Sequence, residues 1–315
     1  DARKTTILRE IEKQGRLTDE LRARIEAVLS KTELEDLYLP YKPKRRTRAS
    51  IARERGLEPL AERILAQAAS EPPRDRLGAP FVSAERGVPD IDAAFAGARD
   101  IVAEAISERA ELRTALRDLA RASGVFVSRV AKGKEEAGAK FRDWFDHREP
   151  ARSIPSHRML ALRRGENEEV LLLRLDVDAD RALGVVRRAV VTNPRAALAG
   201  ELEAAMADAW KRLLAPSIET DVRNDALERA EVEAIRVFAE NLRNLLLAPP
   251  LGGRRVLGVD PGFRTGCKVV AIDEKGDLRE HAVIFPTHSA RQVEEAGRVA
   301  EELCRRHRIE AVAIG

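Results

Sequence analysis

The sequence predicts a mainly helical protein with a small β insertion, followed by a partial α/β domain. The cores must be built mainly from Leu, Val, Ile and Ala, because 44% of the 315 residues are hydrophobic and only 4% are aromatic. This composition favours helix. Short β-branched runs interrupt the helical spacing near residues 125–190, and strand-like runs around a single helix follow the Pro-Pro-Leu-Gly-Gly segment at 249–253. We therefore expect a helical region over residues 1–249 and a separate domain over 250–315.

Apolar residues at core-facing spacing predict the helices of the first region. They cover residues 18–29, 32–39, 57–68, 90–108, 112–123 and 194–215. Thr18, Ser50 and Asp90 are expected to cap helices, and Pro216 is expected to end one. Ser217 would then cap a long successor that reaches about Leu247. Strands are predicted at 125–130 and 170–177.

The terminal region shows the order β, β, β, α, β. Strands are predicted at 256–259, 267–272, 281–285 and 311–314, with a helix over 289–308. The RNase H-like fold and the actin-like ATPases both begin in this order. The pattern alone yields this pair of folds and does not choose between them.

Asp260 follows the first of these strands and is the candidate catalytic and metal-binding residue. A two-metal nuclease needs several carboxylates to hold two Mg²⁺ ions. The nearest others, Asp273, Glu274 and Asp277, belong to the opposite hairpin turn, so a nuclease site would be incomplete in this chain. Two alternatives stay open. Asp260 with Thr265 matches an actin-like phosphate loop, although Pro261 lacks the backbone N–H that such a loop needs; or a Pro-Gly type II turn joins the strands and Asp260 merely caps it.

Positive charge gathers in one stretch, residues 42–55. It holds seven basic residues and one acidic residue, whereas the whole chain carries a net charge of only +3. Such a cluster attracts polyanions without reading sequence. The predicted nucleic-acid contacts are Lys42, Lys44, Arg45, Arg46 and Arg48. The alternative is a solvated loop whose arginines pair with nearby carboxylates.

Several classes of protein do not fit the sequence. No apolar run approaches the roughly 20 residues of a membrane span, and the beginning has no signal-peptide pattern, so we expect a cytoplasmic protein with no membrane partner. Cys267 and Cys304 lie far apart, and the five histidines show no metal-ligand spacing. We expect no cofactor, apart from Mg²⁺ under the nuclease interpretation.

Two stretches carry a family resemblance. The first, at residues 34–62, is LEDLYLPYKPKRRTRASIARERGLEPLAE, and the second, at 257–273, is LGVDPGFRTGCKVVAID. Both are similar to the bacterial Tex family of transcription accessory proteins, and the likeness extends along the chain in order. The resemblance implies a cytoplasmic scaffold that binds nucleic acid, chiefly RNA and also DNA, and acts with the transcription machinery. It further implies a helix-turn-helix in the N-terminal region.

The resemblance also implies that residues 250–315 are the first half of a YqgF/RuvC-like RNase H-fold domain, truncated at the end of this sequence. It further assigns positions within the second stretch. Asp260 falls on the first-strand acidic position of the RuvC-like motif, and Gly258, Gly262 and Gly266 fall on its glycines. Members of the family are regarded as scaffolds and not as proven nucleases. The resemblance therefore implies a binding protein, with a metal-dependent RNase H-like or resolvase-type nuclease as the alternative.

Overall fold

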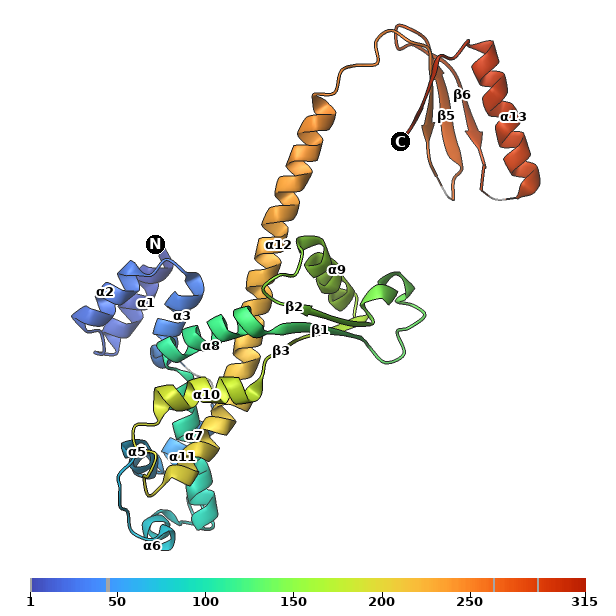
Figure 1. The fold of residues 1–315 in the computed structure, drawn as a ribbon. Helices are drawn as coiled ribbons and strands as arrows, with labels where there is room; N and C mark the ends of the chain where they lie inside the picture. Colours follow the sequence, from blue (N-terminus) through green and yellow to red (C-terminus); the bar gives the residue numbers. More distant parts are fainter. Residues whose placement is uncertain (1, 44–45, 263, 288) are drawn as a thin grey trace. The chain divides into compact units, whose positions relative to one another are not determined.

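The computed structural model describes residues 2–43, 46–262, 264–287 and 289–315, and the chain forms two compact units. The first covers Asp1–Val237 and the second Phe238–Gly315. The first is mainly helical with a small sheet, and the second is a four-stranded sheet with a helix (Figure 1). The predicted fold class is confirmed. Within these residues, no helix combines the length and apolarity that crossing a membrane would require.

The helices of the first unit build two separate hydrophobic cores. The smaller core lies between α1 (Ala2–Lys13), α2 (Asp19–Ala27) and α3 (Lys31–Tyr38), and buries Ile7, Ile11 and Ile25. The larger core surrounds α7 (Ile91–Ser107), whose Phe95 is fully buried. Other helices that contribute to it include α4 (Arg48–Glu54), α5 (Glu58–Ala66), α6 (Arg74–Gly78), α8 (Ala110–Ser123), α10 (Ala179–Val190) and α11 (Ala199–Asp208).

Polar caps fix several helix starts, largely as the sequence predicts. Thr18 accepts a hydrogen bond from the Leu21 amide, and Asp90 accepts one from the Ala93 amide. The prediction that Ser50 caps a helix is wrong. Thr47 is the N-cap of α4, and Ser50 is the third helical residue, whose hydroxyl accepts from the Thr47 amide. Each residue thus satisfies an amide of the other in a capping box.

The β insertion is a three-stranded antiparallel sheet in the order β2-β1-β3. Its strands are β1 (Val125–Val130), β2 (Asp146–Pro150) and β3 (Leu171–Asp176). The predicted strands correspond to β1 and β3, whereas β2 was not predicted, because its sequence DHREP has no apolar alternation. The helix α9 (Ser156–Asn167) covers one face, where Gly165 lets the backbone approach Leu171.

The expected helix break at Pro216 is wrong. From α11 the chain passes through a π-helical segment at Ala209–Leu214 and continues directly into α12, Ala215–Leu246. The extra residue in the π turn accommodates a proline that lacks an N–H and would clash with the preceding turn of a regular α-helix. Ser217 is therefore an interior residue of a continuous helix and caps nothing.

The second unit follows the predicted order of elements. Its strands are β4 (Val256–Asp260), β5 (Cys267–Ile272), β6 (Leu278–Ile284) and β7 (Ala311–Ile314), and its helix is α13 (Ala290–Arg306). The sheet order is β6-β5-β4-β7, with β4 and β7 parallel and the other pairs antiparallel. A small core around Leu257, Val269 and Leu303 joins the sheet to α13.

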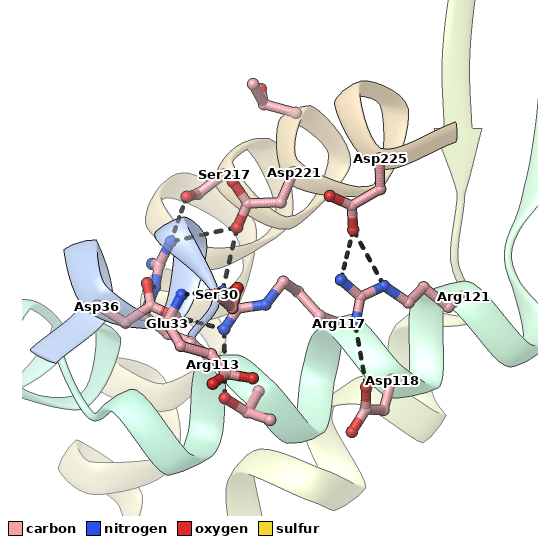
Figure 2. Close-up of polar contacts among 12 residues, drawn as sticks. Ser30, Glu33, Asp36, Arg113, Arg117, Asp118, Arg121, Ser217, Asp221 and Asp225 are labelled. Atoms are coloured by element: carbon pink, nitrogen blue, oxygen red, sulfur yellow. Dashed lines mark hydrogen bonds and ion pairs between the residues drawn. The ribbon is translucent and has the colours of Figure 1, made fainter. Parts of the chain in front are cut away.

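A buried cluster of charges joins α3, α8 and α12 in the first unit (Figure 2). Arg113 and Arg117 of α8 both contact Asp36 of α3, and Arg117 Nη1 lies 3.2 Å from Asp221 Oδ2 of α12. Arg113 Nη2 also donates to the Ser217 hydroxyl at 2.6 Å. Arg117 is only 2% exposed and Asp36 only 4%. These charges are stable in the interior only because they neutralise one another.

The charge cluster continues along α8 and α12. Arg113, Arg117 and Arg121 are four residues apart on α8 and so share one face. Arg121 Nε lies 3.1 Å from Asp225 Oδ2, one turn beyond Asp221 on α12. Burial raises the pKa of Asp221, although Arg113 and Arg117 act in the opposite direction. The acceptor Asp36 Oδ2 touches Arg117 as an ion pair without the alignment of a hydrogen bond.

Replacing Arg117 with Met should strongly destabilise the first unit, because it leaves Asp36 and Asp221 buried with fewer partners. We expect the free energy of unfolding to fall by about 3–5 kcal/mol. Urea unfolding followed by tryptophan fluorescence reports this unit, since Trp144 and Trp210 both lie in it.

The matched control is Arg164→Met, which removes an arginine that is 72% exposed and paired with Glu168. Its expected loss is about 0.5 kcal/mol. Equal effects of the two substitutions would show that the buried cluster has no special role.

Candidate nucleic-acid interface

The predicted contact residues lie in one segment, residues 42–48, which we call the basic loop. It follows α3 and the short 3₁₀ helix Leu39–Tyr41, and it ends in the first turn of α4. Lys44 and Arg45 lie outside the described residues. The structure thus describes Lys42, Arg46 and Arg48 of the five predicted contacts.

The beginning of the basic loop is tied to the small core. Tyr38 is 2% exposed and its hydroxyl donates to Glu10 of α1. Burial and this hydrogen bond raise the pKa of Tyr38 to about 12. The Gln14 side-chain amide donates to the Tyr41 carbonyl at 2.8 Å. Asp36, two residues before Tyr38, is held by the buried charge cluster. The backbone therefore leaves α3 in a fixed direction.

The end of the basic loop is tied to the large core through Glu104 of α7. Glu104 is only 8% exposed. Its carboxylate accepts from the Thr47 hydroxyl at 3.0 Å and from Arg53 Nη1 at 2.7 Å. Since Thr47 is also the N-cap of α4, a single buried acid fixes both the cap and the far end of this helix. The guanidinium group of Arg53 is already paired with Glu104, so Arg53 is not a candidate for binding a ligand.

The three described contact residues remain largely available to a ligand. Lys42, Arg46 and Arg48 are all exposed. Arg46 lies 3.7 Å from Glu54, but both side chains are more than half exposed, at 73% and 62%. An exposed pair of this kind contributes about 0–1 kcal/mol. Among the residues that the structure describes, Lys42 and Arg48 form no ion pair. Among the three described contacts, the alternative in which the arginines are already paired therefore applies only weakly, to Arg46. Elsewhere in the stretch 42–55 it holds for Arg53.

Sequence reasoning missed the two acids that position the basic loop, Asp36 and Glu104. Both look like ordinary helical acids in the sequence. The available signal was that Glu104 stands in the apolar run Ile101-Val102-Ala103-Glu104-Ala105-Ile106, where a charge needs a partner. Asp36 carries a weaker form of the same signal, between Leu34 and Leu37.

Asp260, the second predicted site, is exposed at the end of β4 and stands opposite Lys268 of β5. The type II turn is wrong: Gly262 does not have the positive φ that this turn requires, and the positive φ of this segment is at Gly266, +80°. Gly262 is needed for space instead, because a Cβ there would lie 2.4 Å from the Gly266 carbonyl oxygen.

The acids around Asp260 do not fit a two-metal site. Asp273 follows the far end of β5, about 17 Å along the strand from Lys268, and it accepts from the Lys275 and Asp277 amides and from Arg279. Within the described ranges, no three His, Cys, Asp or Glu side chains form a group that would hold a metal ion. Asp260 thus belongs to no such group among the described residues, and its catalytic and metal-binding roles stay predictions.

Known protein families match residues in each of the two units. The family described as Tex central region-like matches residues 69–238, and the family described as Tex protein YqgF-like domain matches residues 254–315. The chain is 44% identical to Protein tex of Bordetella pertussis, over 98% of this chain and 40% of that protein. It is 40% identical to Transcriptional accessory protein Tex of Neisseria gonorrhoeae, over 100% of this chain and 41% of that protein.

A more distant relative is the human S1 RNA-binding domain-containing protein 1, which is 28% identical over 93% of this chain and 30% of that protein. The chain thus spans about two fifths of the length of its two bacterial relatives. The Tex central region match alone covers more than half of the 315 residues. With its helical region and its YqgF-like domain in this order, the chain belongs to the Tex family of transcription accessory proteins.

Proposed function

We propose that this chain binds nucleic acid, chiefly RNA, through the phosphate backbone, and that it does so in the cytoplasm as part of a transcription accessory scaffold. The observation that carries the proposal is a set of exposed cations on a loop whose two ends are fixed by buried acids. Lys42 and Arg48 form no ion pair with a described residue and interact only at longer range with Glu35 and Asp100, and Arg46 has only an exposed partner. DNA is the second ligand of the same chemistry.

Rigidity matters here because binding a polyanion orders the side chains that contact it. The hydrogen bonds of Tyr38, Thr47 and Arg53 hold the backbone at both ends before a ligand arrives. The backbone at the two ends of the loop then does not have to be ordered on binding, which reduces the entropic cost. Contacts to phosphates release counterions and carry no base information, so we expect strong salt dependence and little sequence preference.

The names of relatives support this proposal. One relative is called a transcriptional accessory protein, and another is called an S1 RNA-binding domain-containing protein. The transcription machinery is accordingly the second class of partner that we propose. The chain covers only part of these relatives, so the proposal for the basic loop concerns a contribution to binding and not the whole affinity of a longer protein.

Replacing Lys42, Arg46 and Arg48 with Ser should flatten the salt dependence of RNA binding. Each lost phosphate contact removes about 0.7 from the slope of log K against log salt for a single strand, so the expected change is about 2. Fluorescence anisotropy of a labelled single-stranded RNA at several salt concentrations measures it. Adding Lys44→Ser and Arg45→Ser tests the complete predicted set.

The control removes the same charge elsewhere, by replacing Arg181, Arg188 and Arg195 with Ser. All three are exposed residues of the first unit, distant in sequence from the basic loop. This variant keeps the overall charge of the test variant, so a general loss of attraction would affect both equally. An unchanged slope in the Lys42/Arg46/Arg48 variant would exclude the basic loop.

The alternative function, a metal-dependent nuclease, is favoured by one observation. Asp260 stands exposed at the end of β4, which lies inside the sheet between β5 and β7. Because one carboxylate does not hold two metal ions, we expect the 315-residue chain with Mg²⁺ or Mn²⁺ to cleave single-stranded and branched substrates no faster than its Asp260→Asn variant. Gel analysis of end-labelled substrates checks this. Cleavage that disappears in Asp260→Asn would instead support the nuclease.

A further inference from the structure

The first unit contains the same short motif twice, and each copy forms a turn. The motif is Glu-Arg-Gly followed by an aliphatic residue, and it occurs at residues 54–57 and 85–88. The aliphatic residues, Leu57 and Val88, are only 1% and 0% exposed and belong to the large core. The arginines, Arg55 and Arg86, are exposed. Each copy is therefore anchored to the core at one end and presents an arginine to the solvent.

Backbone hydrogen bonds define both turns. In the first, the amides of Gly56 and Leu57 donate to carbonyls of α4 at 2.9 and 3.1 Å, which is the Schellman pattern of a helix end. In the second, Ser83 and Val88 exchange hydrogen bonds of 2.8 and 2.9 Å around a four-residue loop. Gly56 and Gly87 have positive φ, +78° and +70°, a conformation that glycine adopts without strain. The two arginines therefore start from defined backbone positions.

The two turns lie next to each other, and each arginine reaches the glycine of the other copy. Arg86 Nη1 would lie 3.0 Å from a Cβ at Gly56, and Arg55 Nη2 would lie 3.2 Å from a Cβ at Gly87. The Cζ and Nε atoms of Arg55 lie 3.5 Å from that same Cβ position, so the guanidinium plane covers Gly87. The missing side chains of the two glycines thus provide the space in which two guanidinium groups come together.

Among the described residues, no acid forms an ion pair with Arg55 or Arg86. Glu54 and Glu58, the acids nearest to Arg55 in the sequence, pair with other arginines at 3.7 and 3.3 Å. Glu85, next to Arg86, is exposed. The two arginines and Glu85 together keep one net positive charge at this surface. Two cations held side by side repel one another, and a bound anion relieves that repulsion.

We propose that Arg55 and Arg86 together bind one backbone phosphate of RNA and extend the path of the strand beyond the basic loop. The inference rests on the proposed function. Arg48 of the basic loop is seven residues from Arg55, so the two share one face of α4 and lie about 10 Å apart along it. At roughly 3.4 Å per nucleotide of a stacked strand, this distance corresponds to about three nucleotides.

A phosphate of a bound strand suits this pair for two reasons. Its two unesterified oxygens can accept from two guanidinium groups at once, and arginine binds phosphate through paired hydrogen bonds. A strand that is already held at the basic loop also brings its next phosphates close to the pair, which raises their effective concentration. Because Arg86 lies outside the basic stretch 42–55, the pair extends the binding surface to a segment that the charge pattern of the sequence does not indicate.

The test uses Arg55→Gln, Arg86→Gln and the double variant of the 315-residue chain, with anisotropy of labelled dodecauridylate at several salt concentrations. We expect the double variant to bind about fivefold more weakly. Its slope of log K against log salt should fall by about 0.7, the value for one phosphate. Because both groups hold one phosphate, the double variant should lose less than the product of the two single losses. Unchanged binding, or losses that simply multiply, would overturn the proposal.

The charge-matched control is Arg181→Gln/Arg188→Gln, which removes two exposed arginines of α10. It should bind RNA like the parent chain, and an equal loss in this control would show a general effect of charge and contradict a specific site. Circular dichroism verifies that all variants are folded.

The basic-loop variant, with Lys42, Arg46 and Arg48 replaced by Ser, separates this inference from the proposed function. If that variant loses salt dependence while Arg55→Gln/Arg86→Gln behaves like the parent chain, the inference fails and the proposed function stands. The reverse result would exclude the basic loop and support the arginine pair as a phosphate site. No binding of RNA by the parent chain would overturn both.

Discussion

The buried contact between Asp36 and the guanidinium groups of Arg113 and Arg117 determines much of the first unit. Removing these charges from water is expensive, and only a geometry that pairs them compensates for it. Asp221 of α12 contacts the same arginines, so three helices that are far apart in sequence must meet in one arrangement. An apolar contact between the same helices would tolerate sliding, whereas a paired charge does not.

The same principle positions the candidate binding loop. The chain reaches Lys42 six residues after Asp36, so the charge cluster also determines where the basic loop begins. Glu104 acts similarly at the other end, through Thr47 and Arg53. Buried arginines of this unit, such as Arg113 and Arg117, hold helices together, whereas some exposed ones, such as Arg48, form no ion pair with a described residue. The proposed function depends on the exposed residues and its rigidity on the buried ones.

The sequence predicts the second unit well, because its strands are short apolar runs bounded by glycine or by turn residues. β4, β5 and β7 consist mostly of aliphatic side chains, and such runs have few alternative structures. The long α7 is similarly clear, since Asp90 caps it and its apolar residues recur at helical spacing. In these elements local preference and tertiary packing point to the same structure.

The wrong and missed predictions have a common cause: tertiary contacts outweigh the structural preference of the local sequence. The strand β2 has hardly any apolar residues and exists because β1 offers it a hydrogen-bonding edge. Pro216 lies within a continuous helix because a π turn precedes it. At the start of α4, Thr47 and Ser50 are both good caps, and Glu104, more than fifty residues later, bonds the first of them. Contacts between residues so far apart in the sequence cannot be predicted from the local sequence.

Whether a charged side chain already has a partner decides what it offers to a ligand. The chain has 56 Lys and Arg residues, and most of the arginines contact a carboxylate, so the abundance of basic residues by itself indicates little. Arg48 and Arg53 are both arginines of α4, but Arg53 pairs with Glu104 whereas Arg48 forms no ion pair with a described residue. On the small sheet, Arg148 pairs with Asp176 at 2.9 Å, whereas the exposed Arg129 and Arg174 form no ion pair with a described residue. For Asp260 the criterion works in the opposite direction: a two-metal site needs several neighbouring ligands, and no group of three potential ligands lies among the described residues. The exposed cations without an ion pair therefore carry the binding proposal, and Asp260 alone does not carry a catalytic one.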